Sequence, residues 1–165
     1  MKKISVLFIL FCMAVFPGCS GEQPDCNLEK EEVAQILDDF WRAIENKDFD
    51  RLSEIIAHDT DMVFFGTDEN ERWAGWEVVK EALQKQFTAF KSIKIQTNNT
   101  IIHVSSSCQT AWFSLQRFIE IETQDAPKSG MKNRVTGVFG KREGQWRMVQ
   151  YHCSYPLTNW QKFKY

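Results

Sequence analysis

The hydrophobic pattern of this chain changes its period once, near residue 92, and that change constrains the fold more than any other feature. Before it, apolar residues recur at helical spacing, as on one face of an α-helix. After it, apolar and polar residues alternate over four long segments, as in half-buried β-strands. Helices followed by antiparallel strands in hairpin order predict an α+β fold. No internal repeat or second domain is visible.

Three helices are expected before this change. The first has an apolar stripe from Val33 to Ile44 at helical spacing, with Asn27 as its N-cap. Asp48 is placed to cap the second helix. A short apolar strand and a polar loop that carries Trp73 precede the third. In chain order the expected elements are helix 28–46, helix 48–56, strand 62–65, loop 66–75 and helix 76–90.

Four strands follow, with expected bounds of 93–104, 110–123, 133–142 and 145–155. The first is interrupted at 97–99, most simply by a bulge. A three-residue loop at 142–144, with its glycine in the left-handed conformation, is the expected connection between the last two strands. This loop pairs Arg134 with His152. A two-residue loop would shift the pairing by one residue and separate them.

The two faces of that last hairpin differ in character. One face mixes charged, amide, imidazole and apolar groups, which suits the wall of a ligand cavity. The other is apolar and suggests a second copy of the chain as partner, so we expect a homodimer through the outer sheet face. The expected cavity wall comprises Arg134, Thr136, Val138, Met148, Gln150, His152 and Ser154. The expected partner face comprises Val135, Phe139, Val149 and Tyr151.

The N-terminal segment is a separate unit. Two lysines precede an apolar run from Ile4 to Phe16. At ~1.5 Å per residue this run is too short to cross a hydrocarbon layer ~30 Å thick, and it is typical of a secretory signal. Its ending at Cys19 resembles the bacterial lipobox, in which the cysteine becomes the lipid-modified first residue. The expected segments are signal peptide 1–18, tether 19–27, domain 28–156 and tail 157–165.

Export fixes the expected location and the chemistry of the cysteines. We expect the protein in the bacterial cell envelope, lipid-anchored through Cys19 on the periplasmic side or at the outer membrane, and secreted if Cys19 is not lipidated. Cys26, Cys108 and Cys153 then remain in the domain. Three thiols allow at most one intramolecular disulfide, and their spacing fits no zinc pattern. The sequence leaves their disulfide state open.

Composition and motifs exclude several classes of protein. A hydrophobic content of 43% rules out a disordered chain. With 20 basic and 22 acidic residues, the formal net charge of −2 gives no excess positive field for nucleic acid. The sequence has no glycine-rich phosphate loop, metal-binding motif or hydrolase motif, so neither a cofactor nor a metal is expected.

Several segments together resemble the SnoaL-like branch of the nuclear transport factor 2-like superfamily. They are 40–50, 61–68, 73–77, 134–138 and 145–154, and the resemblance covers nearly all of 28–156. It implies a strongly curved, mostly antiparallel sheet around a long helix, forming a cone with a pocket at its wide end, usually as a dimer. The superfamily includes isomerases, cyclases, dehydratases, transport factors and oligomerisation domains, so membership alone assigns no activity.

The best-understood chemistry on this fold is ketosteroid isomerisation, which needs a carboxylate base and a phenol with a protonated acid as oxyanion donors. Alignment with that family puts Phe40 at the phenol position and Phe64 at the base position. Since neither ring can donate or accept the proton, this activity is not expected. His152 is then the candidate acid–base residue, and Asp61 or Asp68 at strand ends could supply a base.

Three functions are compatible with these observations. The first is an envelope-anchored domain that binds a small, partly apolar molecule in the cone pocket without catalysis. The second is a SnoaL-like enzyme of isomerase, cyclase or dehydratase type with His152 as acid/base. The third is a dimeric protein-interaction module whose pocket is vestigial. A roomy pocket with Arg134 and His152 facing inward favours the first two functions, and a pocket filled by Trp and Phe side chains favours the third. The expected ligand-binding residues are Trp41, Phe64, Trp73, Trp112, Arg134, Gln150 and His152.

Overall fold

The structure is a computed structural model that describes residues 25–156. The predicted signal peptide, Cys19 and the tail 157–165 lie outside the described residues. The helices are α1 (Asn27–Asn46), α2 (Phe49–Ile55) and α3 (Trp76–Ala89). The strands are β1 (Val63–Phe65), β2 (Arg72–Ala74), β3 (Phe90–Val104), β4 (Thr110–Thr123), β5 (Ser129–Arg142) and β6 (Gln145–Ser154). Apart from β2, which lies inside the expected polar loop, each of these elements was predicted from the sequence.

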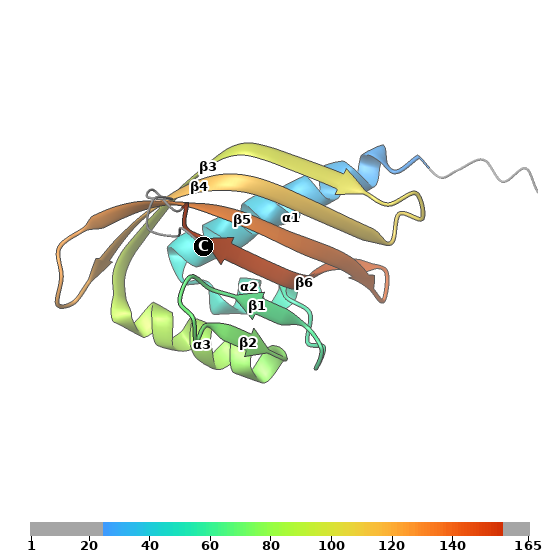
Figure 1. The fold of residues 1–165 in the computed structure, drawn as a ribbon. Coiled ribbons are helices and arrows are strands. Elements are labelled where there is room, and N and C mark those ends of the chain that lie inside the picture. The colour runs from blue at the N-terminus through green and yellow to red at the C-terminus, as the bar shows by residue number, and fades with distance from the viewer. Residues whose placement is uncertain (1–24, 157–165) are drawn as a thin grey trace, which may run out of the picture.

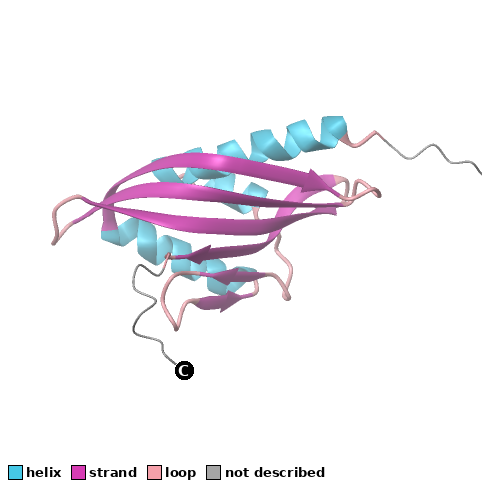
Figure 2. Cartoon of the chain, turned by 45° about the horizontal axis from the view of Figure 1, so that its top comes forward, coloured by secondary structure: helices cyan, strands magenta, loops and turns pink. Residues whose placement is uncertain are grey.

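The six strands form one sheet in the order β2-β1-β6-β5-β4-β3. All neighbouring pairs are antiparallel except β1 with β6, which are parallel. The sheet curves strongly, and the three helices lie on its concave side (Figures 1 and 2). This is the α+β arrangement of three helices on a curved, mostly antiparallel sheet that the sequence predicts.

The first helix forms because its apolar stripe faces the sheet. Val33, Leu37 and Phe40 are buried, as helical spacing requires. The helix ends at Lys47, which adopts the left-handed conformation at φ 55°. The expected Asn27 cap is wrong: the N-cap is Cys26, whose side chain makes no capping hydrogen bond, and the Asp25 side chain accepts from the backbone N–H of Asn27 at 3.0 Å. The second helix begins as expected, with the Asp48 side chain accepting a hydrogen bond from the backbone N–H of Arg51.

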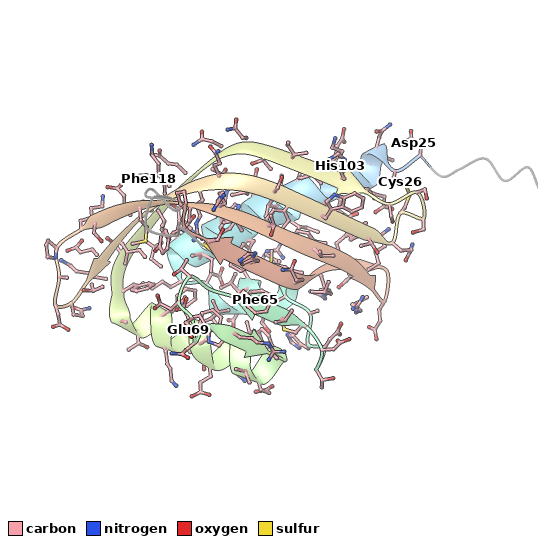
Figure 3. All side chains as sticks on the ribbon, viewed as in Figure 1. Asp25, Cys26, Phe65, Glu69, His103 and Phe118 are labelled. Carbon is pink, nitrogen blue, oxygen red and sulfur yellow. A yellow bond between two sulfur atoms is a disulfide. The ribbon has the colours of Figure 1, made fainter. Side chains whose placement is uncertain are left out.

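The end of the molecule where α1 begins, which we call the closed end, is densely packed. The turns of the β3–β4 and β5–β6 hairpins lie there, and Figure 3 shows Cys26 at this end of α1. Cys26 forms a disulfide with Cys108, which ties the start of α1 to the β3–β4 loop. Gly137 lies under the Phe113 ring, where an added Cβ would meet a ring carbon at 2.5 Å. Only glycine allows this ring to lie so close to β5.

The register of the last hairpin differs from the prediction. The loop contains two residues, Glu143 and Gly144, both at positive φ, and Arg142 pairs with Gln145. A two-residue turn of this kind matches the twist of the flanking strands. The shorter turn shifts the pairing by one residue, and a bulge in β6 shifts it by one more, so Arg134 lies opposite Ser154 and the predicted pairing of Arg134 with His152 is wrong.

A bulge in β6 also exchanges its two faces. Phe139 pairs with Met148 and Val138 pairs with Gln150, so Val149 is an extra residue. Side chains of a strand alternate between faces, so one extra residue reverses the alternation beyond it. As a result Tyr151 and Cys153 point to the concave side, and Gln150 and His152 point outward. The predicted partner face, of which Val135, Phe139 and Tyr151 are buried, is therefore largely internal.

Candidate ligand-binding cavity

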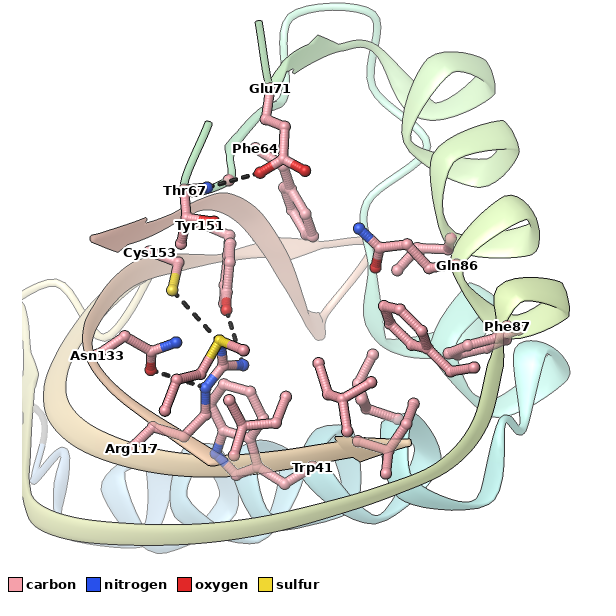
Figure 4. A pocket seen from close by; sticks show the side chains of 18 of the residues that line it. Trp41, Phe64, Thr67, Glu71, Gln86, Phe87, Arg117, Asn133, Tyr151 and Cys153 are labelled. Carbon is pink, nitrogen blue, oxygen red and sulfur yellow. Dashed lines mark hydrogen bonds between the residues drawn. The ribbon is translucent and has the colours of Figure 1, made fainter. Parts of the chain in front are cut away.

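A cavity of about 390 Å³ opens between the concave face of the sheet and the helices. It lies at the end opposite the closed end, near the β4–β5 loop and the last turns of α1 and α3. We call this the open end. Figure 4 shows the cavity with its labelled side chains. Most of its wall is apolar, and three of the predicted ligand-binding residues line it: Trp41, Phe64 and Trp73.

The polar part of the wall is centred on Arg117 of β4 (Figure 4). Its Nε donates to Asn133 Oδ1 at 3.0 Å, and Asn133 is the directly opposite residue on β5. Its Nη1 donates to the Tyr151 hydroxyl at 3.1 Å, and its Nη2 to Cys153 Sγ at 3.4 Å. The guanidinium also lies 5.3 Å from the Trp41 ring centre, within cation–π distance. Four elements thus hold one cation in place.

The partners of Arg117 carry no charge at neutral pH. Burial raises the pKa of Tyr151 far above its usual value, despite the opposing effect of the nearby Arg117 charge. Burial likewise raises the pKa of the Cys153 thiol, with Arg117 again opposing it. Among the ion pairs of the described residues, none involves Arg117. The cavity therefore contains a guanidinium surrounded by neutral groups.

Aromatic rings surround the Tyr151 phenol. Its ring centre lies 5.2 Å from that of Phe64, 6.1 Å from that of Phe40 and 6.4 Å from that of Trp41. Phe40 and Phe64, the residues at the predicted phenol and base positions, both line the cavity. The phenol at the centre of these rings thus comes from β6, and a flat apolar ligand would find ring faces and edges around it.

A carboxylate occupies another part of the wall. One oxygen of Glu71 accepts hydrogen bonds from the backbone N–H groups of Thr67, at 2.6 Å, and Asp68, at 3.1 Å. Gly66 permits this placement, because a Cβ there would lie 2.0 Å from the same oxygen. In Figure 4 Glu71 and Arg117 lie on opposite sides of the cavity. The cavity can thus offer hydrogen-bond donors at one side and an acceptor at the other.

Four predicted ligand-binding residues lie outside this cavity. Arg134 and His152 are exposed on the convex face, and Gln150 shares that face. Arg134 donates to the Tyr155 carbonyl oxygen at 3.2 Å. Trp112 is 46% exposed, and its ring is stacked on His103 at 5.5 Å. The shorter turn explains why Arg134 faces outward, and the bulge explains why Gln150 and His152 do. Trp112 faces outward because side chains alternate along β4.

The sequence reasoning missed the groups that make the polar wall: Glu71, Arg117, Asn133, Tyr151 and Cys153. One signal was present for Arg117. It falls in an alternating row whose other members are apolar and buried, among them Phe113, Leu115 and Ile119. A charged residue in such a row points into a protein interior, where it needs partners or a ligand. Asp61 and Asp68, the predicted bases, are exposed.

Residues 25–156 lack two further features. No group of three or more histidine, cysteine, aspartate or glutamate side chains in this range is placed to hold a metal ion. No helix in the same range has the length and apolar character needed to cross a membrane.

Solved structures with the same architecture come from several bacteria. A nuclear transport factor 2-like superfamily protein from Salmonella enterica superposes with a TM-score of 0.73 at 17% identity, covering 83% of this chain and 98% of that one. A protein from Streptomyces avermitilis, proposed to be a dehydratase of the same family, gives a TM-score of 0.70 at 18% identity over 79% and 98%. A hexachlorocyclohexane dehydrochlorinase gives 0.66 at 11% over 76% and 84%. At such identities the likeness concerns the fold alone.

Sequence comparison gives the family directly. Among curated proteins, none matches this chain. The SnoaL-like domain family matches residues 33–158, which is most of the chain and includes every element from the apolar stripe of α1 onward. The chain therefore belongs to the SnoaL-like domain family, and its fold is shared with nuclear transport factor 2-like proteins.

Proposed function

We propose that this SnoaL-like domain binds a small, partly apolar molecule in its cavity without catalysing a reaction. The observation that carries the proposal is the cavity itself. About 390 Å³ stays open although aromatic side chains line it. Interiors are normally packed without voids of this size, and a mostly apolar cavity with a few convergent polar groups is the usual form of a ligand site.

The polar groups support binding over catalysis. Arg117 is hydrogen-bonded to Asn133, Tyr151 and Cys153, and the phenol and thiol stay protonated at neutral pH. A general base needs a pKa near the working pH and access to the substrate. His152, the predicted acid–base residue, lies outside the cavity. One observation favours an enzyme as second candidate: Glu71 lines the same cavity and could take a proton there.

Binding of a neutral, apolar fluorescent probe such as N-phenyl-1-naphthylamine tests the proposal. The lipid-free domain is expected to enhance its fluorescence, and the change Ile121→Trp is expected to abolish the enhancement because Ile121 lines the cavity. Gln116→Trp adds the same indole to the exposed face of the same strand and serves as the control. Equal signals from both variants would contradict the cavity as the binding site.

Native mass spectrometry of protein purified from its own envelope identifies the natural ligand class. A small molecule released on unfolding supports the binding function. A protein that is free of ligand and also turns over a carbonyl substrate, with loss of turnover in Glu71→Gln, favours the enzyme.

We also propose that Cys19 carries lipid and anchors the domain in the bacterial cell envelope. The Cys26–Cys108 disulfide supports export, because stable disulfides form mainly in oxidising compartments. Fractionation of cells that produce the full chain is the test. The protein is expected with the membranes, and the Cys19→Ser variant in the soluble fraction. If both fractionate alike, the anchor is not Cys19.

A homodimer through the outer sheet face is the last part of the proposal. The residues that the sequence assigned to it are internal, but Trp112 and Ile101 are 46% and 53% exposed on the convex side. Sedimentation of the wild-type chain and of Trp112→Ser tests this contact. A dimer that becomes monomeric in the variant supports it, and a wild-type monomer contradicts it.

A further inference from the structure

The positive charge of Arg117 has no carboxylate in direct contact with it. Among the described residues that line the cavity, Arg117 is the only lysine or arginine and Glu71 is the only carboxylate. Glu71 lies across the cavity and forms no ion pair with Arg117. Arg117 is half-buried. A charge partly removed from water is stabilised by a paired anion, so an unpaired guanidinium in a largely apolar wall favours binding of an anion.

Arg117 also retains hydrogen-bonding capacity. A guanidinium has five N–H donors in one plane. Three are used, toward Asn133, Tyr151 and Cys153. Within the described chain, the remaining two N–H groups, one on each Nη, have no acceptor. Two N–H donors on neighbouring nitrogens match the two oxygens of a carboxylate.

The surroundings hold the guanidinium in one orientation. Asn133, which is 3% exposed, accepts from Nε, and the Trp41 ring supports the guanidinium at 5.3 Å. Neither contact neutralises the charge. A side chain fixed in this way loses little further rotamer freedom when a ligand binds, which lowers the cost of recognition.

We propose that the ligand is an organic monoanion, with one carboxylate bound to Arg117 and an apolar, ring-containing body among the aromatic side chains. This inference rests on the proposed binding function and names the ligand's chemical class. Glu71 limits the ligand to one negative charge, because a second anionic group at the far end of the ligand would be repelled by the Glu71 carboxylate. The free oxygen of Glu71 can accept a hydrogen bond from a hydroxyl group at that end.

A matched pair of probes tests the charge requirement. 2-Naphthoate and 2-naphthalenemethanol share one apolar body and differ in the carboxylate. Isothermal titration of the lipid-free domain is expected to give a Kd about 10- to 100-fold lower for the carboxylate, the range of a charged hydrogen-bonded contact. Equal affinities for the two probes would overturn the anion proposal and leave the binding function intact. Binding of neither probe would contradict the binding function as well.

Three variants locate the effect. Arg117→Met is expected to remove the preference for the carboxylate while keeping binding of the alcohol. Arg117→Lys keeps the charge but loses the two-pronged geometry, so it is expected to retain part of the preference. Arg134→Met removes one positive charge from the exposed face of the neighbouring strand and is expected to behave as wild type. A preference that survives in Arg117→Met, or that is lost in Arg134→Met, would overturn the proposal. If Arg117→Met does not fold, the salt dependence of wild-type binding is the deciding measurement. Added salt is expected to weaken binding of 2-naphthoate and to leave binding of 2-naphthalenemethanol unchanged.

Discussion

The two ends of the concave face are built from the same strands but filled differently. At the closed end, Phe113, Phe139 and Met148 are almost completely buried, in one cluster with Val33 of α1. At the open end the same rows of β4 and β6 carry Arg117 and Tyr151, and a cavity remains. Close packing at one end supplies apolar burial that the other end lacks. This contrast agrees with the proposed function, in which one end of the sheet provides stability and the other binds the ligand.

Further links hold the closed end together. A disulfide joins Cys26 to Cys108. Glu29 accepts hydrogen bonds from Lys141 Nζ at 2.6 Å and from Trp146 Nε1 at 2.8 Å, which connects α1 to the β5–β6 hairpin. If the division is correct, changes at the closed end should alter stability without altering the affinity for a cavity probe.

The largest effect is expected from a matched pair of ring deletions. Phe139→Ala removes a completely buried ring and is expected to lower the free energy of unfolding by about 4 kcal/mol. Phe87→Ala removes a half-buried ring beside the existing cavity and is expected to cost about 1–2 kcal/mol. Urea unfolding measures both losses. An unchanged slope of the unfolding free energy against urea concentration shows that the folded and unfolded states keep their compactness. Equal losses would show that the two ends do not differ in packing.

The disulfide is expected to have the second-largest effect. It joins cysteines 82 residues apart, so opening it in a Cys26→Ser, Cys108→Ser double variant is expected to cost about 3 kcal/mol. The Kd of the neutral cavity probe should stay unchanged at temperatures where the variant is folded. A weaker probe affinity in the double variant would show that the closed end shapes the cavity.

The architecture was predictable because it depends on long patterns. The period change near residue 92 averages over many residues, and β4 has the expected bounds of Thr110–Thr123. The bulge in β3 was also readable, at the register shift between Asn98 and Ile101. In such segments one misplaced residue changes little, since the neighbours still define the period.

The cavity was predictable only in part because it depends on single residues. One residue in the β5–β6 turn and one extra residue, Val149, determine which groups of the last hairpin face inward. Neither is encoded in the alternation itself, so Tyr151 was assigned to the wrong face. Trp41 was predicted to line the cavity because it lies beside the helix stripe instead of at its centre. Arg117 was readable from its apolar row and was overlooked.

The smallest effect is expected from Glu29, and it depends on pH. Its hydrogen bond with Lys141, followed by that with Trp146, lowers the pKa of Glu29 in the folded state. A folded-state pKa below the unfolded value of about 4.3 means that the ionised form stabilises the protein. This stabilisation is fully present above the unfolded pKa and is lost as the pH falls through the folded one. Glu29→Gln is therefore expected to cost up to about 1 kcal/mol at pH 7 and progressively less below pH ~4.

Urea unfolding of both proteins between pH 3 and pH 7 measures this difference. Glu54→Gln is a suitable control, because Glu54 pairs with Arg51 between exposed side chains and makes no contact with the closed end. The loss of unfolding free energy in Glu54→Gln should be smaller than that in Glu29→Gln at every pH. A Glu29→Gln deficit that stays constant with pH would mean that Glu29 acts by packing against Trp146 and Lys141. The link between α1 and the β5–β6 hairpin would then be steric, and the closed end would owe its rigidity to packed rings and the disulfide.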